Sequence, residues 1–451
     1  MSTASGRPSR HVSAIYIAML SVGMVVGAGI FKSPSQVADA AGAPIWLFAA
    51  WALAGFITLI GALCYAELAT AFPHPGGDYH FLGRAFGRGW AFLFAWARFA
   101  VINTGSIALL GIVLGDYLNT ALSLGPHGSG IYAALSVGAL TLFNLKGAGK
   151  GNDAGDYGLT SLEVMGLLIM VVAAIALIVQ GQRPAEPFFG AGSDPSLAGF
   201  GVALVYALLA YGGWSEVATL SAEVKDPRRG MVRALVLAVG LITALYLAVN
   251  WAFWYGLGVT GMTASQTPAV DLIAKAFGPA AGVITALAIA FAVITSINAT
   301  IVVGARTTFA WARDWRALAI FGGWDERKQI PVAATWAQGV IALALIVLAS
   351  AYKGFATLVD YTAPVYWLFL TMSGLAVIVM RAKEPDAPRP FRVPFYPVLP
   401  IVFIATSAAM LMSSLSYVTA AGNAGLLASA WVFLTGLIAL VVAICMERSA
   451  R

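Results

Sequence analysis

Apolar segments alternate with short polar segments along almost the whole chain. Each apolar segment is close to the roughly 20 residues that an α-helix needs to cross the hydrocarbon core of a bilayer. There are twelve such segments: 13–39, 45–70, 88–122, 131–144, 157–180, 199–222, 233–257, 279–304, 334–351, 355–380, 398–415 and 425–446. The pattern predicts an all-α polytopic membrane protein with twelve transmembrane helices, preceded by a polar, disordered segment at residues 1–12.

The composition supports this class. Hydrophobic residues make up 60% of the 451 residues and charged residues 10%, whereas a soluble domain carries about 25% charged residues. The two cysteines, Cys64 and Cys445, lie in apolar segments, so neither a disulfide framework nor a metal site is predicted. The sequence has no nucleotide-binding loop, no zinc-protease motif and no Ser/His/Asp set. We therefore expect no enzymatic activity, no cofactor and no nucleic-acid partner.

The basic residues indicate how the chain crosses the membrane. With the N-terminus placed in the cytoplasm, the basic residues of the outer loops are Arg183, Lys275 and Lys353 alone. Cytoplasmic loops are enriched in Lys and Arg, so this orientation is favoured. We expect a multi-pass protein of the cell inner membrane with both termini in the cytoplasm. Lys32 and Arg98 remain inside predicted spans.

Glycines interrupt the first and the sixth apolar segments. The first contains Gly27-Ala28-Gly29, and the sixth contains Gly212-Gly213. Within a bilayer, irregular backbone is tolerated only where it is buried in protein or lines a water-filled cavity. Two interrupted helices at corresponding positions of two halves are typical of a transporter's binding site. Close helix packing through small residues is the alternative interpretation.

The two interrupted segments each begin a unit of five spans, residues 13–180 and residues 199–380. Because five is odd, the second unit enters the membrane in the opposite orientation, as in transporters built from inverted repeats. Residues 398–446 add two helices outside the repeat, and no soluble domain or long linker divides the chain. We expect a single transport domain.

The interruptions predict a site for the zwitterion of an amino acid. The amides near Gly29 and Ile30 lack helical acceptors and lie at a positive dipole end, so they suit a carboxylate. Carbonyls freed near Tyr211 and Gly212 suit an ammonium group. Trp214, beside the second interruption, takes part either in packing or in gating. The substrate-binding residues predicted on these grounds are Val26, Gly27, Ala28, Gly29, Ile30, Asn103, Tyr211, Gly212, Gly213, Ser215 and Asn298.

Some polar residues in or near the spans have two interpretations. Asn103 and Asn298 either line the side-chain pocket or form hydrogen bonds between helices. Glu67 and Glu216 lie near helix ends, where a cap or a loop salt bridge competes with substrate contact. Arg98 either pairs with a buried carboxylate or extends to the membrane surface.

The residues around the interruptions also match a known family. Residues 26–31, followed by Ser33-Pro34, resemble the G-[SA]-G-[IV]-F signature of the amino acid-polyamine-organocation superfamily. Gly212-Gly213-Trp214 resembles the helix-six motif of its L-type amino acid transporters. Further matches lie at 67–79, 223–227, 304–314 and 385–397, so the resemblance covers nearly the whole chain.

The resemblance implies a LeuT-like fold, a 5+5 inverted repeat with discontinuous helices 1 and 6. It also implies alternating-access transport of L-amino acids, usually without sodium, by exchange or proton coupling. Human L-type members pair with a glycoprotein through an extracellular cysteine, which this sequence lacks, so it is most similar to bacterial members. We expect an amino acid substrate and membrane lipid as partners, and no heavy-chain glycoprotein.

Two positions differ from the family pattern. Relatives commonly carry an aromatic gate three residues before the first glycine of the helix-six motif, where this chain has Leu209. Leu209 is therefore predicted to line the binding site and to leave it wider. Many L-type relatives carry a lysine on helix five, where the best match here is Glu163. Glu163 either couples transport to protons or forms a static ion pair with Arg98.

We expect neutral amino acids to be the substrates, because Glu163 and Glu216 are the only carboxylates placed near the predicted pocket. A carrier of cationic amino acids or polyamines with the same fold is the alternative. Outside transport, the alternative is a membrane-embedded amino acid sensor, which would normally carry a soluble signalling domain. A channel would need a continuous polar path, and no repeated filter motif is present.

Overall fold

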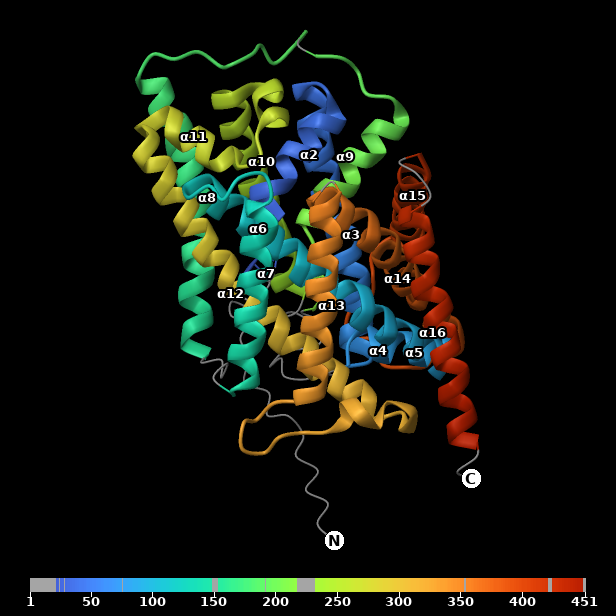
Figure 1. The fold of residues 1–451 in the computed structure, drawn as a ribbon. Coiled ribbons are helices and arrows are strands. Elements are labelled where there is room, and N and C mark those ends of the chain that lie inside the picture. The colour runs from blue at the N-terminus through green and yellow to red at the C-terminus, as the bar shows by residue number, and fades with distance from the viewer. Residues whose placement is uncertain are drawn as a thin grey trace.

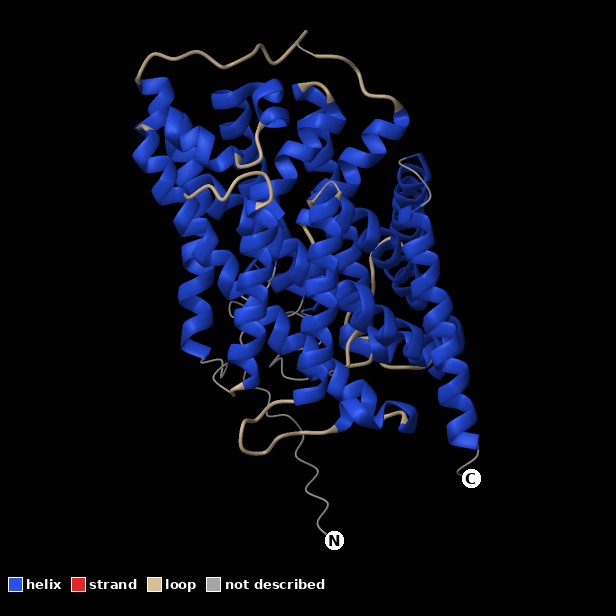
Figure 2. Ribbon diagram, viewed as in Figure 1, coloured by secondary structure: helices blue, strands red, loops and turns tan. Residues whose placement is uncertain are grey.

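The structure, a computed structural model, is built from α-helices, many of which run along one common axis (Figures 1 and 2). It describes residues 22–448 except 24, 28, 75, 148–152, 191, 217–231, 353 and 421–423. The side chains of 153–163, 417–420 and 424–430 also lie outside the description. The described residues contain no β-strand, which confirms the all-α class predicted from the apolar pattern.

The first part of the chain, up to residue 210, forms the helices α2 to α9. The helices are α2 (Gly29–Ala41), α3 (Pro44–Ala71), α4 (Asp78–Phe86), α5 (Arg88–Ala97), α6 (Thr104–Ala121), α7 (Gly128–Leu145), α8 (Asp153–Val179) and α9 (Leu197–Ala210). A π-helical turn, η1 (Arg98–Asn103), joins α5 and α6 into one continuous helix. Such π-helical turns occur frequently at functional sites.

The remaining helices follow the predicted segments closely, with some additions. They are α10 (Val232–Ala264), α11 (Pro268–Phe277), α12 (Pro279–Arg313), η4 (Arg316–Gly322), α13 (Val332–Ala351), α14 (Phe355–Lys383), α15 (Val398–Ala420) and α16 (Ala424–Arg448). The short helices α4, α11 and η4 lie in segments that the apolar pattern assigned to loops. These helices are too short to cross a membrane, so the apolar pattern did not predict them. α4 and α11 each bury one apolar side.

Among the described residues, nine helices are long and apolar enough to cross a membrane. The three other predicted spans, at 13–39, 157–180 and 199–222, each include residues or side chains outside the description. Their described parts include α2, the apolar stretch Val164–Val179 and α9. The structure therefore supports a polytopic membrane protein, and the count of twelve spans stays a prediction.

α3 lies in the core of the bundle and contacts α2, α9, α10, α14 and α15. Trp51 and Cys64 on α3 are fully buried. Two glycines let neighbouring side chains approach this helix closely. A Cβ at Gly55 would come within 3.0 Å of the Tyr211 hydroxyl, and a Cβ at Gly61 within 2.8 Å of the Trp214 ring. α3 is thus the surface on which the end of α9 packs.

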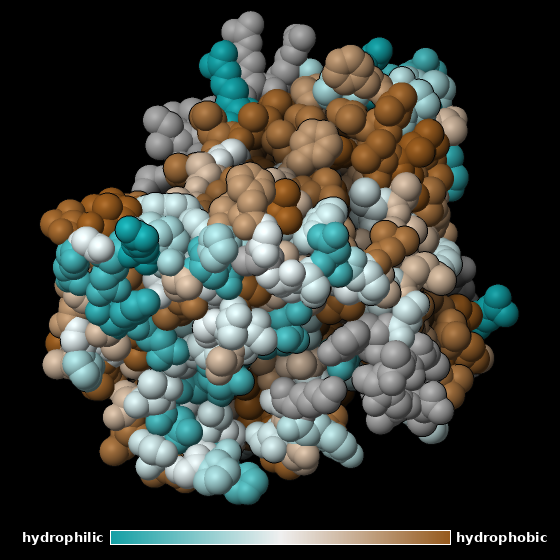
Figure 3. All heavy atoms as spheres, turned by 90° about the horizontal axis from the view of Figure 1, so that it is seen from above, coloured by the Kyte–Doolittle hydropathy of each residue, from teal (hydrophilic) through white to brown (hydrophobic). Residues whose placement is uncertain are grey.

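The outer surface carries many large apolar side chains, as expected for contact with lipid. Examples are Phe56, Ile284, Phe291 and Trp431, each more than half exposed. Viewed from the end of the bundle opposite the termini, hydrophilic residues cover much of the central surface and apolar residues border parts of it (Figure 3). This distribution suits a bundle whose end meets water and whose sides meet hydrocarbon.

Candidate functional site

α2 begins in the middle of the first apolar segment, at Gly29. Immediately before it, Val26 and Gly27 form a bend, and the Gly27 amide donates to the carbonyl of Val25 at 2.8 Å. The first amides of an α-helix have no acceptor four residues earlier and lie at the positive end of the helix dipole. The amides of Gly29 and Ile30 therefore present donors where the helix is interrupted.

α9 ends at Ala210, in the middle of the sixth apolar segment. The turn that follows is closed by the Gly212 amide, which donates to the Leu209 carbonyl at 3.0 Å. Gly213 has φ +104°, a conformation that glycine adopts without the cost of a side chain. The last carbonyls of a helix lack helical donors and lie at the negative end of the dipole. They therefore present acceptors at the second interruption.

The two interruptions lie against each other. A Cβ added to Gly29 would lie 3.3 Å from the Cα of Ala210, so the start of α2 touches the end of α9. The hydroxyl of Tyr246, on α10, lies 3.0 Å from the carbonyl oxygens of both Val25 and Ala210. A phenol has one proton to donate, so it serves these two carbonyls alternately. Tyr246 therefore positions both helix ends. In the sequence it is one tyrosine within the apolar segment 233–257, and only its hydroxyl indicates a polar role.

The glycines at the two interruptions differ in how closely the described atoms approach them. None of the described atoms lies within 4 Å of a Cβ built on Gly27, although Gly27 is half-buried. A Cβ built on Gly29 would lie 3.3 Å from a backbone atom, and one built on Gly212 would lie 2.9 Å from a backbone atom. Gly29 thus serves close packing, as the alternative interpretation held, whereas no described atom restricts Gly27 in this way.

The aromatic side chains at the second interruption pack against α3. The Tyr211 ring is fully buried, and its hydroxyl donates to the Trp51 carbonyl at 3.2 Å. Trp214 is 4% exposed and meets the ring of Tyr65 edge-on, with ring centroids 4.9 Å apart. This geometry favours the packing interpretation of Trp214, and it leaves the backbone of Tyr211 as the part that can face a substrate.

The two asparagines make contacts between helices. The side-chain amide of Asn144 donates to Asn298 at 2.7 Å, which joins α7 to α12. Asn103 lies in the π-helical turn and donates to Thr307 on α12 at 3.5 Å. These bonds favour the interhelical interpretation of both side chains. Of the other predicted binding residues, Val26 and Ile30 are fully buried, Leu209 and Ser215 are half-buried, and Ala28 lies outside the described residues.

Arg98 forms an ion pair with a carboxylate that follows the second interruption. Arg98, at the start of the π-helical turn, donates to Glu216 at 2.7 Å, three residues beyond Gly213. This contact bears out the pairing of Arg98 with a carboxylate, because the chain brings the region after the second interruption next to η1. A pair between Arg98 and Glu163 stays a prediction. The side chain of Glu163 lies outside the description. Glu216 therefore joins the α9 interruption to the long helix α5–η1–α6.

A further carboxyl lies near this pair. Asp78, the first residue of α4, accepts a hydrogen bond from Ser373 on α14 at 2.9 Å. Burial raises the pKa of the Asp78 carboxyl to about 6, while hydrogen bonds from Tyr65 and Ser373 and the charge of Arg98 act in the opposite direction. Asp78 therefore changes charge at a higher pH than an exposed aspartate does.

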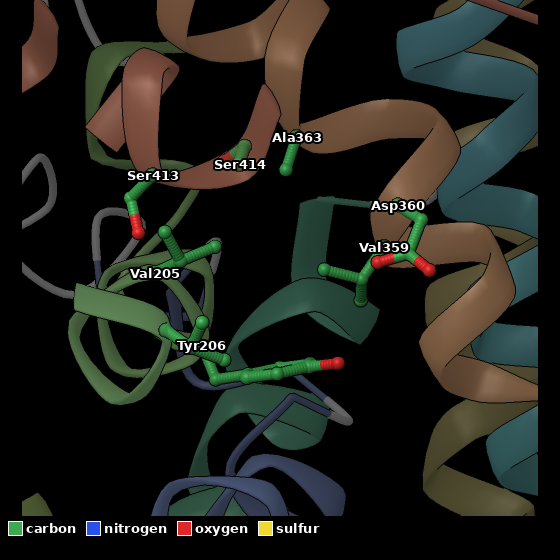
Figure 4. A pocket seen from close by; sticks show the side chains of 8 residues that line it. Val205, Tyr206, Val359, Asp360, Ala363, Ser413 and Ser414 are labelled. Atoms are coloured by element: carbon green, nitrogen blue, oxygen red, sulfur yellow. The ribbon is translucent and has the colours of Figure 1, made fainter. Parts of the chain in front are cut away.

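A separate cavity lies between α9, α14 and α15. Its lining includes Tyr206, Asp360 and Ser414, whose elements face one another across the cavity (Figure 4). Its volume of about 10 Å³ for a water-sized probe is what a single water molecule requires. It is too small for an amino acid, so it does not replace the interrupted helices as the candidate substrate site.

Comparison with known proteins supports a transporter. The model of the amino acid permease family matches residues 13–413. The b(0,+)-type amino acid transporter 1 of Rattus norvegicus is 28% identical over 396 residues, which cover 87% of this chain and 80% of the relative. The large neutral amino acids transporter small subunit 2 of Homo sapiens is 28% identical over 402 residues, which cover 87% of this chain and 74% of the relative.

These relatives correct one expectation. The absence of an extracellular cysteine led to the expectation of no heavy-chain partner, yet the human relative is by its name one subunit of a larger assembly. The expectation is wrong because subunits also associate through noncovalent interfaces, so a missing cysteine does not argue against a partner. The expectation that the chain is no enzyme agrees with the permease match and the transporter relatives.

Proposed function

Because the chain belongs to the amino acid permease family, we propose that it is a secondary transporter of neutral L-amino acids that works by alternating access. We also propose twelve spans with a LeuT-like 5+5 inverted repeat, in the cell inner membrane, with both termini in the cytoplasm. The substrate site is formed by the interrupted first and sixth helices.

One observation carries the proposal: the start of α2 and the end of α9 meet, with the Gly29 position 3.3 Å from the Ala210 Cα. The Gly29 and Ile30 amides offer donors for a carboxylate, and the last carbonyls of α9 offer acceptors for an ammonium group. Tyr246 fixes the two ends relative to each other through bonds of 3.0 Å. Every amino acid carries both groups on its α-carbon, so the backbone alone recognises the common part of the substrate.

Counterflow in proteoliposomes tests the proposed function. Vesicles loaded with an unlabelled neutral L-amino acid should take up the labelled form faster than empty vesicles, because exchange accelerated by internal substrate is a property of carriers. A panel of competing amino acids then defines selectivity. Competition by lysine or arginine alone would favour the cationic carrier, and binding without any flux would favour a sensor.

Selectivity should respond to Leu209, which is half-buried at the end of α9. Leu209→Phe adds a ring beside the proposed side-chain pocket, so transport of tryptophan relative to alanine should fall by about tenfold. Leu197→Phe is the matched control, because Leu197 begins the same helix and is 90% exposed. Equal ratios in the Leu209→Phe variant and the wild type would remove Leu209 from the pocket.

Glu163 should couple transport to protons. An ionisable residue within a span is a candidate functional residue, and a carboxyl can carry a proton through the transport cycle. Glu163→Gln mimics the protonated form and should abolish accumulation driven by a pH gradient while exchange continues. Accumulation is measured in proteoliposomes with an imposed gradient.

Asp78→Asn provides the control for this prediction, because burial raises the pKa of the Asp78 carboxyl to about 6 and Asp78 lies outside the spans, at the start of α4. We expect Asp78→Asn to retain pH-driven accumulation. Loss of coupling in Asp78→Asn with normal coupling in Glu163→Gln would assign the proton to Asp78 instead.

A further inference from the structure

Lys32 lies on the first turns of α2, three residues after Gly29. Its side chain is 2% exposed, although a buried ammonium is costly unless it is paired. The three protons of the ammonium have three acceptors. They are the Asp116 carboxylate at 2.7 Å, the Gln266 carbonyl at 3.1 Å and the Gln266 side-chain oxygen. The helix that carries the proposed carboxylate-binding amides is therefore tied to two other elements.

Both anchors of Lys32 belong to elements that hold their own geometry. Asp116 lies on α6, and the hydroxyl of its neighbour Tyr117 donates to the Phe31 carbonyl at 2.8 Å. Gln266 lies between α10 and α11. The residues on either side of Gln266 brace this connection, since Ser265 donates to Asp271 on α11 and accepts from the amide of Thr267 at 3.1 Å.

These contacts lie at one end of the bundle. Figure 1 shows α2 and α11 together at the end opposite both termini. With the termini in the cytoplasm, this is the outer side. For the site at Gly27–Ile30 to open outward, α2 has to move away from α6 and from the α10–α11 connection.

We propose that the Lys32–Asp116–Gln266 contact is the latch that closes the outer side of the substrate site, and that it separates each time the site opens outward. This inference rests on the proposed function, because it assigns a step to the transport cycle. Lys32 is a positioning residue: it acts on the substrate through α2. A charged latch suits a reversible step, since the ammonium and carboxylate regain their hydration when they part, which offsets much of the lost attraction.

The test measures how often α2 leaves its closed position, without requiring transport. Ser35, on the same helix, is 2% exposed, and its hydroxyl is without a hydrogen-bond partner among the described residues, so Ser35→Cys is a mild reporter. It is placed in a background in which Cys64 and Cys445 are replaced by serine. A membrane-impermeant thiol reagent is then added to the outside of intact cells.

Lys32→Met should raise the labelling rate of the reporter by about tenfold or more, because a hydrogen bond to a charged group is lost together with its pair. Lys275→Met is the matched control. Lys275, on α11 at the same end, donates to the Gly256 carbonyl at 2.6 Å and leaves α2 untouched, so its removal should not change labelling. The double variant Lys32→Met/Asp116→Asn should also be labelled fast. If Lys32→Met alone fails to reach the membrane, the labelling rate of the double variant decides the test.

An unchanged labelling rate in the Lys32 variants overturns the latch. Its failure is distinct from failure of the transport proposal. If the wild type shows counterflow but the Lys32 variants label no faster than it does, only the latch is wrong. If the Lys32 variants label fast but the wild type shows no counterflow, the transport function is wrong, and Lys32 still holds α2 in its closed position.

Discussion

Replacing Gly29 with leucine should lower transport at least about 100-fold while the protein still reaches the membrane. A Cβ at this position already lies 3.3 Å from the Ala210 Cα, and backbone cannot yield as a flexible side chain does. A leucine side chain forces α2 away from α9, which separates the helix-start amides from the helix-end carbonyls. Overpacking of this kind costs about 1–3 kcal/mol or more. Uptake normalised to surface expression measures the effect.

Two further glycine variants make this a graded test. Gly29→Ala introduces only the 3.3 Å contact, so an intermediate loss of about tenfold is expected. Gly240→Leu is the matched control, because Gly240 is an exposed glycine on α10 with no described atom within 4 Å of a Cβ. Its transport should equal that of the wild type. Normal transport by Gly29→Leu would show that the substrate site lies elsewhere.

Removing the Glu67 carboxylate should destabilise the protein by about 3–5 kcal/mol. Glu67 is 2% exposed, and Arg381 binds both of its oxygens, at 2.7 Å and 2.6 Å. The Val393 amide adds a bond of 2.7 Å, and Arg389 lies 3.5 Å away. Glu67→Ala leaves two guanidinium groups in a buried site without their carboxylate. Thermal unfolding in detergent should show a clear fall in the melting temperature.

An exposed pair on nearby elements provides the comparison. Arg84 binds both oxygens of Glu384 at 2.7 Å and 2.6 Å, with side chains 41% and 32% exposed. Exposed ion pairs contribute little to stability, so Glu384→Gln should leave the melting temperature nearly unchanged. Equal melting temperatures for the two variants would show that the buried Glu67 ion pairs do not stabilise the protein more than the exposed pair does. The end of α3 would then not be held to α14 by Glu67.

The helix interruptions could be predicted from the sequence because their cause is local. Each interruption contains two glycines within three residues, which weaken helical structure together, so Gly27–Gly29 and Gly212–Gly213 indicated both positions. The extent of α5–η1–α6 was also predicted, since residues 88–121 form one mostly apolar stretch. Its π-helical turn leaves no trace in the apolar pattern.

The contacts that connect the interruptions could not be predicted, because each joins residues distant in the chain. Tyr246 binds a carbonyl 221 positions earlier, and Lys32 binds Gln266, 234 positions later. The sequence shows that Lys32 is an ion in an apolar segment, which requires a partner. It does not show which of several carboxylates and carbonyls the fold brings within reach. Arg98 illustrates the consequence, since the sequence did not single out Glu216 as the partner that the fold brings to it.

The central claim is that the two helix ends recognise the two charged groups of an amino acid. Competition binding on the purified protein tests it, with a labelled neutral L-amino acid that the wild type transports. The competitors are the same compound without its carboxylate and the same compound without its amino group. Each loses charge-assisted hydrogen bonds, so each should compete about 100-fold more weakly than the parent amino acid. Competition by either analogue as strong as that of the parent would contradict a zwitterion site between α2 and α9.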